Sequence, residues 1–334
     1  MTGDRRTFLK VLGGGLAAST MCRISPAAAP ASGRPLAGVF PIAFSPFTEE
    51  NKLDVDALAA EVKFCMRGGV HGFVWPQLAS AWSTLSDGER MDGSEAILAA
   101  GKGGKTALVI GVQAPDMAAI SKYARHAEKL GADAIISLPP AGVSDEKVLL
   151  DFYQQVGRLT ELPLFAQFTG TMSVDLLVEM FRTIPTFRHV KDEAGNPLVR
   201  ISELRRRTGD QLKVFAGNGV ATMITEMELG FSGHCPYTNL ADVYAQAYDL
   251  FHQGQKREAF DMFGRILAFG SMTPTNTIDI MIARGVFKPG TRTRNAPPVP
   301  GAPAWGGNRA VPPPMTHEQI REALEKYLGP YLKG

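Results

Sequence analysis

Cysteine is scarce in this chain. Its 334 residues contain three cysteines, Cys22, Cys65 and Cys235, which are too few for a disulfide framework. No metal-ligand spacing links Cys65 or Cys235 to a histidine. We therefore predict no metal centre and interpret both residues as core residues, because a free cysteine packs as a small hydrophobic side chain.

The chain also lacks a strong charge of either sign and a long apolar run. It has 35 Lys and Arg residues against 33 Asp and Glu residues, a formal net charge of +2. Such a balance provides no field for holding nucleic acid or an anionic membrane. The chain has no run of about 20 apolar residues, the length that a bilayer-spanning helix needs. We expect neither a nucleic-acid partner nor a membrane span.

The first thirty residues resemble a twin-arginine export signal. Arg5 and Arg6 precede a Phe-Leu-Lys sequence, and a weakly apolar run containing glycine follows over residues 11–20. Small residues suited to a signal peptidase then occupy 25–29. We predict that residues 1–29 are a signal peptide. The twin-arginine export machinery would then be a partner, and the mature protein would be periplasmic or secreted.

Short apolar runs alternate with amphipathic stretches through the middle of the chain. Alternating strands and helices indicate a parallel sheet with right-handed crossovers, and eight such units predict a closed (β/α)8 TIM barrel over residues 36–254. A doubly wound open sheet is the alternative, but no Gly-x-Gly-x-x-Gly follows the first strand. The predicted strands are Gly38–Phe44, Gly72–Trp75, Ala107–Gly111, Ala134–Leu138, Leu164–Phe168, His189–Lys191, Lys213–Ala216 and Gly233–Tyr237.

The remainder of the chain, residues 255–334, is predicted to be a C-terminal helical extension packed on the barrel. Helical patterns cover Lys256–Phe269, Thr277–Gly285 and Thr316–Leu328. Between them, residues 295–314 are rich in proline and glycine, which predicts a loop without regular structure.

A lysine ends the sixth predicted strand. Active sites of such barrels lie at the carboxyl ends of the strands, where Lys191 can point into the barrel mouth. Loss of water lowers the pKa of a lysine and leaves more free amine, which can attack a ketone to form an iminium ion. From the spacing alone, an ion pair of Lys191 with Asp192 or Glu193 explains the pattern equally well.

Seven short motifs are distributed along the chain: Gly38–Pro41, Gly68–Gly72, His126–Ala134, Pro139–Pro140, Val190–Asn196, Phe215–Asn218 and Tyr237–Leu240. Together they resemble the dihydrodipicolinate synthase and N-acetylneuraminate lyase family. That family usually carries Ile-Lys-Glu-Ala-x-Gly-Asn where this chain has Val190–Asn196. The resemblance implies that Lys191 is a Schiff-base lysine, that the substrate is a 2-oxo acid such as pyruvate or its aldol adduct, that no cofactor is needed, and that the protein is a homo-oligomer, a dimer or a tetramer.

The segment after the second strand departs from the family pattern. The family usually has Gly-Thr-Thr-Gly-Glu there, whose hydroxyls and amides hold the carboxylate of the 2-oxo acid. Here both threonines are missing, and the apolar segment lies between Trp75 and Trp82, which favours a sugar acid or an aromatic aldehyde as substrate. By matching family positions, we predict substrate contacts from Gln77, Leu78, Ala79, Ser80, Gln167, Gly217 and Cys235.

The family's proton-relaying tyrosine is missing as well. Ala141 and Gly142 stand where the family usually has Tyr-Tyr, and Gln167 begins the segment that replaces Tyr-Asn-x-Pro on strand five. Another group must relay protons if the protein is an enzyme, because losing a general acid or base costs about 10²- to 10⁴-fold in rate. The candidates are Tyr237, Asp192, Gln167 and His71, and we predict Tyr237, which ends strand eight.

Two functions follow from these patterns. The retained Lys191 predicts a Schiff-base-forming lyase of the aldolase, synthase or dehydratase type. The loops lack the family's threonines and tyrosines, which fits an alternative function. The protein would then be a catalytically inactive barrel that binds a small molecule or a protein in the periplasm.

Overall fold

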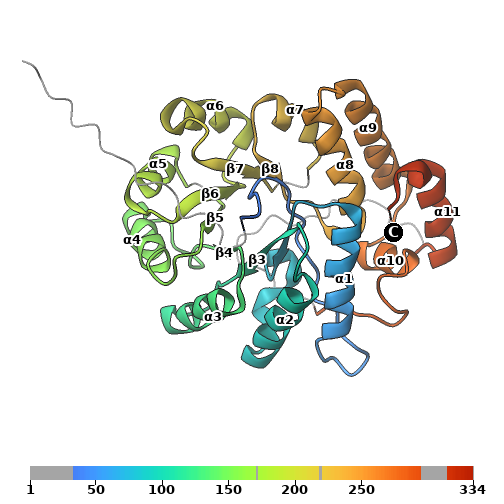
Figure 1. The fold of residues 1–334 in the computed structure, drawn as a ribbon, viewed down its shortest axis with the longest axis horizontal. Coiled ribbons are helices and arrows are strands. Elements are labelled where there is room, and N and C mark those ends of the chain that lie inside the picture. Colours follow the sequence, from blue (N-terminus) through green and yellow to red (C-terminus); the bar gives the residue numbers. More distant parts are fainter. Residues whose placement is uncertain (1–32, 171, 218–219, 295–313, 334) are drawn as a thin grey trace, which may run out of the picture.

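The structure is a computed structural model that describes residues 33–170, 172–217, 220–294 and 314–333. Eight parallel strands form its centre, in the sheet order β1-β8-β7-β6-β5-β4-β3-β2 (Figure 1). Ile42 and Val74 form a bridge between the segments of β1 and β2, so the sheet curves into a nearly closed barrel. The strands are β1 Gly38–Val39, β2 Gly72–Trp75, β3 Ala107–Gly111, β4 Ala134–Ser137, β5 Leu164–Phe168, β6 Phe187–Asp192, β7 Lys213–Ala216 and β8 Gly233–His234.

Helices follow the strands along the chain and surround the barrel in Figure 1. Five of them begin after a Ser or Asp whose side chain accepts a hydrogen bond from the first helical turn, as Asp54 does from Ala57. The helices are α1 Val55–Gly68, α2 Asp87–Ala100, α3 Met117–Leu130, α4 Glu146–Val156, α5 Val174–Thr183, α6 Pro197–Thr208, α7 Met223–Glu228 and α8 Ala241–His252. The predicted (β/α)8 TIM barrel is confirmed.

The interior of the barrel is filled by aromatic rings. The ring centroid of Phe215 lies 5.1 Å from that of Phe40 and 5.2 Å from that of Phe165, in edge-to-face contacts. A second and larger apolar cluster lies between the sheet and the helices. The barrel is therefore a packed core, and its carboxyl end is the place left for chemistry.

The predicted bounds of β2, β3, β5 and β7 are confirmed, whereas β1 and β8 are shorter than predicted. Pro41 and Pro236 interrupt these two strands, because proline has no N–H to donate to a strand ladder. Pairing resumes as single bridges that join Ile42 to Tyr237 and to Val74. The end of β8 is thus an irregular segment that carries Tyr237 to the rim.

The helices after the barrel are α9 Lys256–Met272, α10 Thr277–Ala283 and α11 His317–Leu328, which lie beside α8 and α1 (Figure 1). Arg284 at the end of α10 makes a buried, two-pronged ion pair with Asp242 of α8, at 2.7 and 2.8 Å. The predicted signal peptide and residues 295–313 of the predicted loop lie outside the described residues, so these predictions stand untested.

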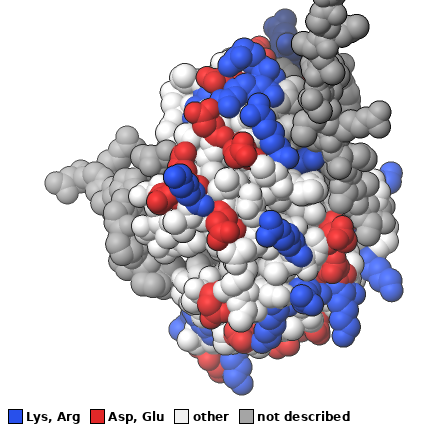
Figure 2. Space-filling view, turned by 90° about the vertical axis from the view of Figure 1, so that its left-hand side faces the viewer, with Lys and Arg blue, Asp and Glu red and all other residues white. Residues whose placement is uncertain are grey.

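The surface carries no charge of one dominant sign on the face drawn in Figure 2, where basic and acidic side chains are interspersed. None of the helices in the described ranges is long and apolar enough to cross a membrane.

Candidate active site

Lys191 lies on the inner face of β6 near the carboxyl end of the barrel. In the strand register it stands between Gln167 of β5 and Phe215 of β7. Alternate residues of a strand face the same side, so Lys191 shares this face with His189, whose ring stacks on Phe165 at 4.3 Å. The lysine is 6% exposed and lies above the aromatic interior.

The amine of Lys191 is engaged by a carboxylate. Its Nζ lies 2.9 Å from Oε1 of Glu193, and the amide nitrogen of Gln167 donates a hydrogen bond to Oε2 of the same carboxylate. The two side chains of the pair are 7% and 16% exposed. Of the two partners that the sequence left open for Lys191, the structure selects Glu193.

Asp192 faces the helix layer. Its Oδ2 lies 3.5 Å from Nε of Arg200 on α6, and its Oδ1 accepts a hydrogen bond from the backbone N–H of Ala194. Burial raises the pKa of Asp192 to about 6, against the opposing effect of Arg200. Asp192 is therefore a poor candidate for proton transfer at Lys191, because its carboxylate is directed at another cation.

His71, another candidate for the proton relay, lies at the opposite end of the barrel. It immediately precedes β2, its Nδ1 accepts a hydrogen bond from the N–H of Val39, and its Nε2 lies 2.9 Å from Asp249. His71 therefore has no access to the candidate site.

Two of the predicted substrate contacts, Gly217 and Cys235, adjoin the Lys191–Glu193 pair. A Cβ on Gly217 would lie 2.3 Å from Oε1 of Glu193 and 2.6 Å from Cε of Lys191, so glycine leaves the space that the pair occupies. Burial raises the pKa of the Cys235 thiol to about 12, although Lys191 acts in the opposite direction. The thiol stays protonated at neutral pH and is no nucleophile there.

The polar side chains of the segment after β2 form hydrogen bonds within the protein. The hydroxyl of Ser80 donates to the carbonyl oxygen of Ala43 at 2.5 Å and accepts a hydrogen bond from the N–H of Gln77. The side chain of Gln77 donates to Gln113, and its Oε1 has no partner within the described parts of the chain. A substrate contact from Ser80 stays a prediction, and its hydroxyl can donate to a substrate only if its bond to Ala43 breaks.

Trp75 does not form the apolar wall that the sequence suggested. It is fully buried, its ring packs against Gly93 of α2, and its Nε1 donates to Ser45 at 3.0 Å. Successive side chains of a strand alternate between faces, and the ring of Trp75 points to the helices and away from the mouth. Trp75 is therefore not available to stack on a sugar.

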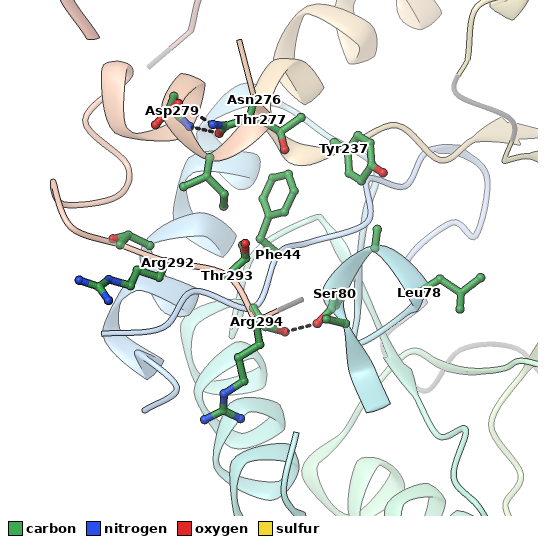
Figure 3. Close-up of a pocket in the computed structure, with 15 residues that line it drawn as sticks. Phe44, Leu78, Ser80, Tyr237, Asn276, Thr277, Asp279, Arg292, Thr293 and Arg294 are labelled. Atoms are coloured by element: carbon green, nitrogen blue, oxygen red, sulfur yellow. Dashed lines mark hydrogen bonds between the residues drawn. The ribbon is translucent and has the colours of Figure 1, made fainter. Parts of the chain in front are cut away.

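A cavity of about 550 Å³ opens at the rim (Figure 3). Tyr237 is 46% exposed there, and its ring stacks on Phe44 at 5.5 Å. The cavity brings together Tyr237 and three predicted contacts, but Lys191 is not among the residues that line it. The wall consists of Phe44, Ser45, Leu78, Ala79, Ser80, Ala81, Tyr237, Asn276, Thr277, Ile278, Asp279, Thr291, Arg292, Thr293 and Arg294.

The C-terminal part of this wall was missed by sequence reasoning. Residues 276–279 and 291–294 carry no catalytic motif. The start of α10 brings the first group to the rim, and an antiparallel bridge between Phe47 and Arg292 holds the second there. The guanidinium of Arg294 is bound to Glu89 at 2.7 Å, and that of Arg292 points away from Tyr237 in Figure 3.

A second cavity of about 280 Å³ lies beside the end of β7. Asp192, Ala216, Gly217 and Glu226 belong to its wall, whereas Lys191 does not. Among the residues that the structure describes, no group of three His, Cys, Asp or Glu side chains could hold a metal ion.

The fold and the site together define a class: a (β/α)8-barrel protein whose candidate site is a buried lysine at the carboxyl end of β6. The sequence model of the dihydrodipicolinate synthetase family matches residues 35–296, and the chain belongs to that family. Its relatives indicate a lyase of this family.

Known relatives are distant in sequence. A 4-hydroxy-tetrahydrodipicolinate synthase of Rhizobium meliloti is 27% identical over 59% of this chain and 66% of its own length. The crystal structure of dihydrodipicolinate synthase from Rhodopseudomonas palustris superposes with a TM-score of 0.70 at 19% identity, covering 88% of this chain and 97% of the other. YagE from Escherichia coli K12, solved in complex with pyruvate, gives 0.69 at 16% identity, covering 87% and 98%. The two solved structures share the fold.

Proposed function

We propose that the protein is a Schiff-base-forming lyase that acts through Lys191 on a 2-oxo acid such as pyruvate or on its aldol adduct. The observation that carries the proposal is the position of the Lys191 amine. It lies on the inner face at the carboxyl end of β6, within 2.9 Å of a carboxylate that can accept its proton. Membership of the family supports the same chemistry.

The chemistry follows from the properties of an iminium ion. The neutral amine of Lys191 attacks the keto carbon of the substrate, water leaves, and the positively charged C=N bond draws electrons from the neighbouring carbon. Cleavage, formation or dehydration at that carbon is then possible. For a 2-oxo acid to react at Nζ, the amine must be released from its ion pair with Glu193.

The substrate is proposed to differ from that of the synthases among the relatives. The Gln77–Ala81 segment has no threonine pair, and its Ser80 hydroxyl is bound to Ala43. Buried amide oxygens of Gln77 and Gln167 have no partner in the described ranges, and they suit hydroxyl donors on a 2-oxo acid or sugar acid. Tyr237, which the sequence predicts as the proton-relaying residue, is exposed at the rim, and we propose that it contacts the far end of such a substrate there.

We also propose a cellular location and an assembly state for the protein. Arg5 and Arg6 support export through the twin-arginine machinery to the periplasm or beyond. We also propose a homo-oligomer, a dimer or a tetramer, by resemblance to the family.

Borohydride trapping tests the proposal. The mature protein is incubated with pyruvate and with longer 2-oxo acids, reduced with borohydride, and its mass is measured. We expect a stable adduct on Lys191 that is absent in Lys191→Arg, which keeps a cation beside Glu193 but cannot form an iminium ion. Lys213→Met, at the amino end of β7, is the matched control and should trap normally.

A folded protein that traps no 2-oxo acid would contradict the lyase. That result would favour the alternative of a barrel without turnover that binds a small molecule or a protein, for which the comparisons give no support.

A further inference from the structure

Glu193 is held in place by two strands. It directly follows β6, and its backbone N–H donates to the carbonyl oxygen of Phe168, the last residue of β5, at 2.8 Å. This bond fixes the start of the side chain next to the inner face of the barrel. The carboxylate therefore reaches Nζ of Lys191 from a rigid part of the fold and not from a loose loop.

Gln167 determines which carboxylate oxygen faces the lysine. A carboxylate only accepts hydrogen bonds, so Gln167 must present its NH2 group to Oε2 of Glu193. The other oxygen, Oε1, then points to Nζ of Lys191 at 2.9 Å. The Oε1 atom of Gln167 is left buried and without a partner in the described part of the chain.

We propose that Glu193 is the acid and base that moves protons at the Lys191 amine, and that Gln167 is its positioning residue. This inference rests on the proposed Schiff-base function. It identifies the group that does the work of the missing tyrosine, and no other carboxylate makes a described ion pair with Lys191.

The proton transfers balance over the cycle. The Glu193 carboxylate takes one proton from the Lys191 ammonium, giving a neutral amine and a carboxylic acid. The amine then attacks the keto carbon; the C–N bond forms, and the electron pair of the C=O bond moves to oxygen. One of the two protons left on the nitrogen moves to that oxygen and makes it a hydroxyl. Glu193 then gives its proton to the hydroxyl, which leaves as water. The products are an iminium ion, one water and the regenerated carboxylate.

The other candidates are less well placed for this role. Tyr237 is stacked on Phe44 in the wall of the rim cavity, and Asp192 is directed at Arg200. The Cys235 thiol adjoins the pair, but burial holds it protonated. Glu193 is the candidate with a described contact to the reacting nitrogen.

The main experiment measures how fast Lys191 forms the trapped adduct with pyruvate. Glu193→Gln keeps the shape of the side chain but cannot accept the proton, so we expect the rate to fall by about 10²- to 10⁴-fold. Glu258→Gln, exposed in the first turn of α9, is the matched control and should trap at the wild-type rate. An ion pair that only keeps Lys191 charged predicts the opposite, a faster reaction in Glu193→Gln.

Chemical rescue separates proton transfer from a structural role. Glu193→Ala leaves a space in which formate can bind, and added formate should restore part of the lost rate in Glu193→Ala but none in Lys191→Arg. Failure of formate to restore any rate, together with wild-type trapping by Glu193→Gln, would overturn the inference. It would leave the lyase proposal intact, whereas an absent adduct in the wild type would remove both.

The positioning role of Gln167 has its own readout. Gln167→Ala removes the donor to Oε2, which makes the carboxylate of Glu193 more basic. The acidic limb of the pH profile of adduct formation should therefore move to higher pH. A lower rate with an unmoved profile would contradict positioning through Glu193.

Discussion

Replacing Glu61 by glutamine should remove a strong pH dependence from the stability of the barrel. Glu61 lies on α1 and is fully buried, and its Oε1 accepts hydrogen bonds from the N–H of Phe44 and the hydroxyl of Thr238. Its Oε2 has no partner in the described ranges. Burial raises the pKa of Glu61 to about 8 from its ordinary value of 4.5, although these hydrogen bonds oppose the shift.

The sign of the effect follows from this raised pKa. Between pH 4.5 and about 8 the folded protein holds a proton on Glu61 that the unfolded chain releases. The stabilisation from the neutral carboxyl is therefore complete below pH 4.5 and is lost as the pH rises to about 8. The free energy of unfolding falls by about 1.4 kcal/mol for each pH unit in this window, and by on the order of 5 kcal/mol across the whole window.

Glu61→Gln imitates the protonated carboxyl and does not titrate. Urea unfolding, followed by circular dichroism at several pH values from about 5 to 8, gives the free energy of unfolding of both proteins. The difference, variant minus wild type, should rise by about 1.4 kcal/mol per pH unit. Asp261→Asn, which removes an exposed carboxylate from α9, serves as the control. A difference that stays constant across this range would refute the reasoning.

Two further predictions concern other parts of the chain. Arg284→Met leaves the buried carboxylate of Asp242 without its cation, so the free energy of unfolding should fall by about 3–5 kcal/mol in urea unfolding, and adding Asp242→Leu should recover part of it. If the single and the double variant lost the same free energy of unfolding, an unpaired buried charge on Asp242 would not explain the loss. Replacing both Arg5 and Arg6 by lysine should keep the precursor in the cytoplasm, as cell fractionation would measure; unchanged export would refute the twin-arginine signal.

The sequence predicts Lys191 and neighbouring strand-end residues as the candidate site, because active sites of such barrels follow the strands. Lys191 was predicted from its place at the end of an apolar strand and from the family pattern around it. Gly217 and Cys235 were predicted as neighbours of the keto-acid pocket, and both adjoin Lys191. Positions at strand ends can be carried over from the family pattern to this sequence, because the register of a parallel barrel fixes which residues meet.

The partner of the lysine could not be decided in the same way. Asp192 and Glu193 are neighbours in sequence, and both can pair with a lysine. Their side chains leave the end of β6 in different directions, one to Arg200 and one to Lys191. Local sequence likewise does not show which distant segments pack together, so it did not indicate that residues 276–279 and 291–294 form part of the rim wall.

The sequence by itself determined the eight repeating units, the barrel and the lysine at the end of the sixth strand, because apolar periodicity and strand ends are local properties of the chain. Only the tertiary structure decided that Glu193 and Gln167 converge on Lys191, that Ser80 is bound to Ala43, and that residues 276–279 and 291–294 form part of the wall of the rim cavity. Those contacts depend on the direction in which each side chain leaves the backbone and on the packing of distant segments, and neither is encoded in local sequence patterns.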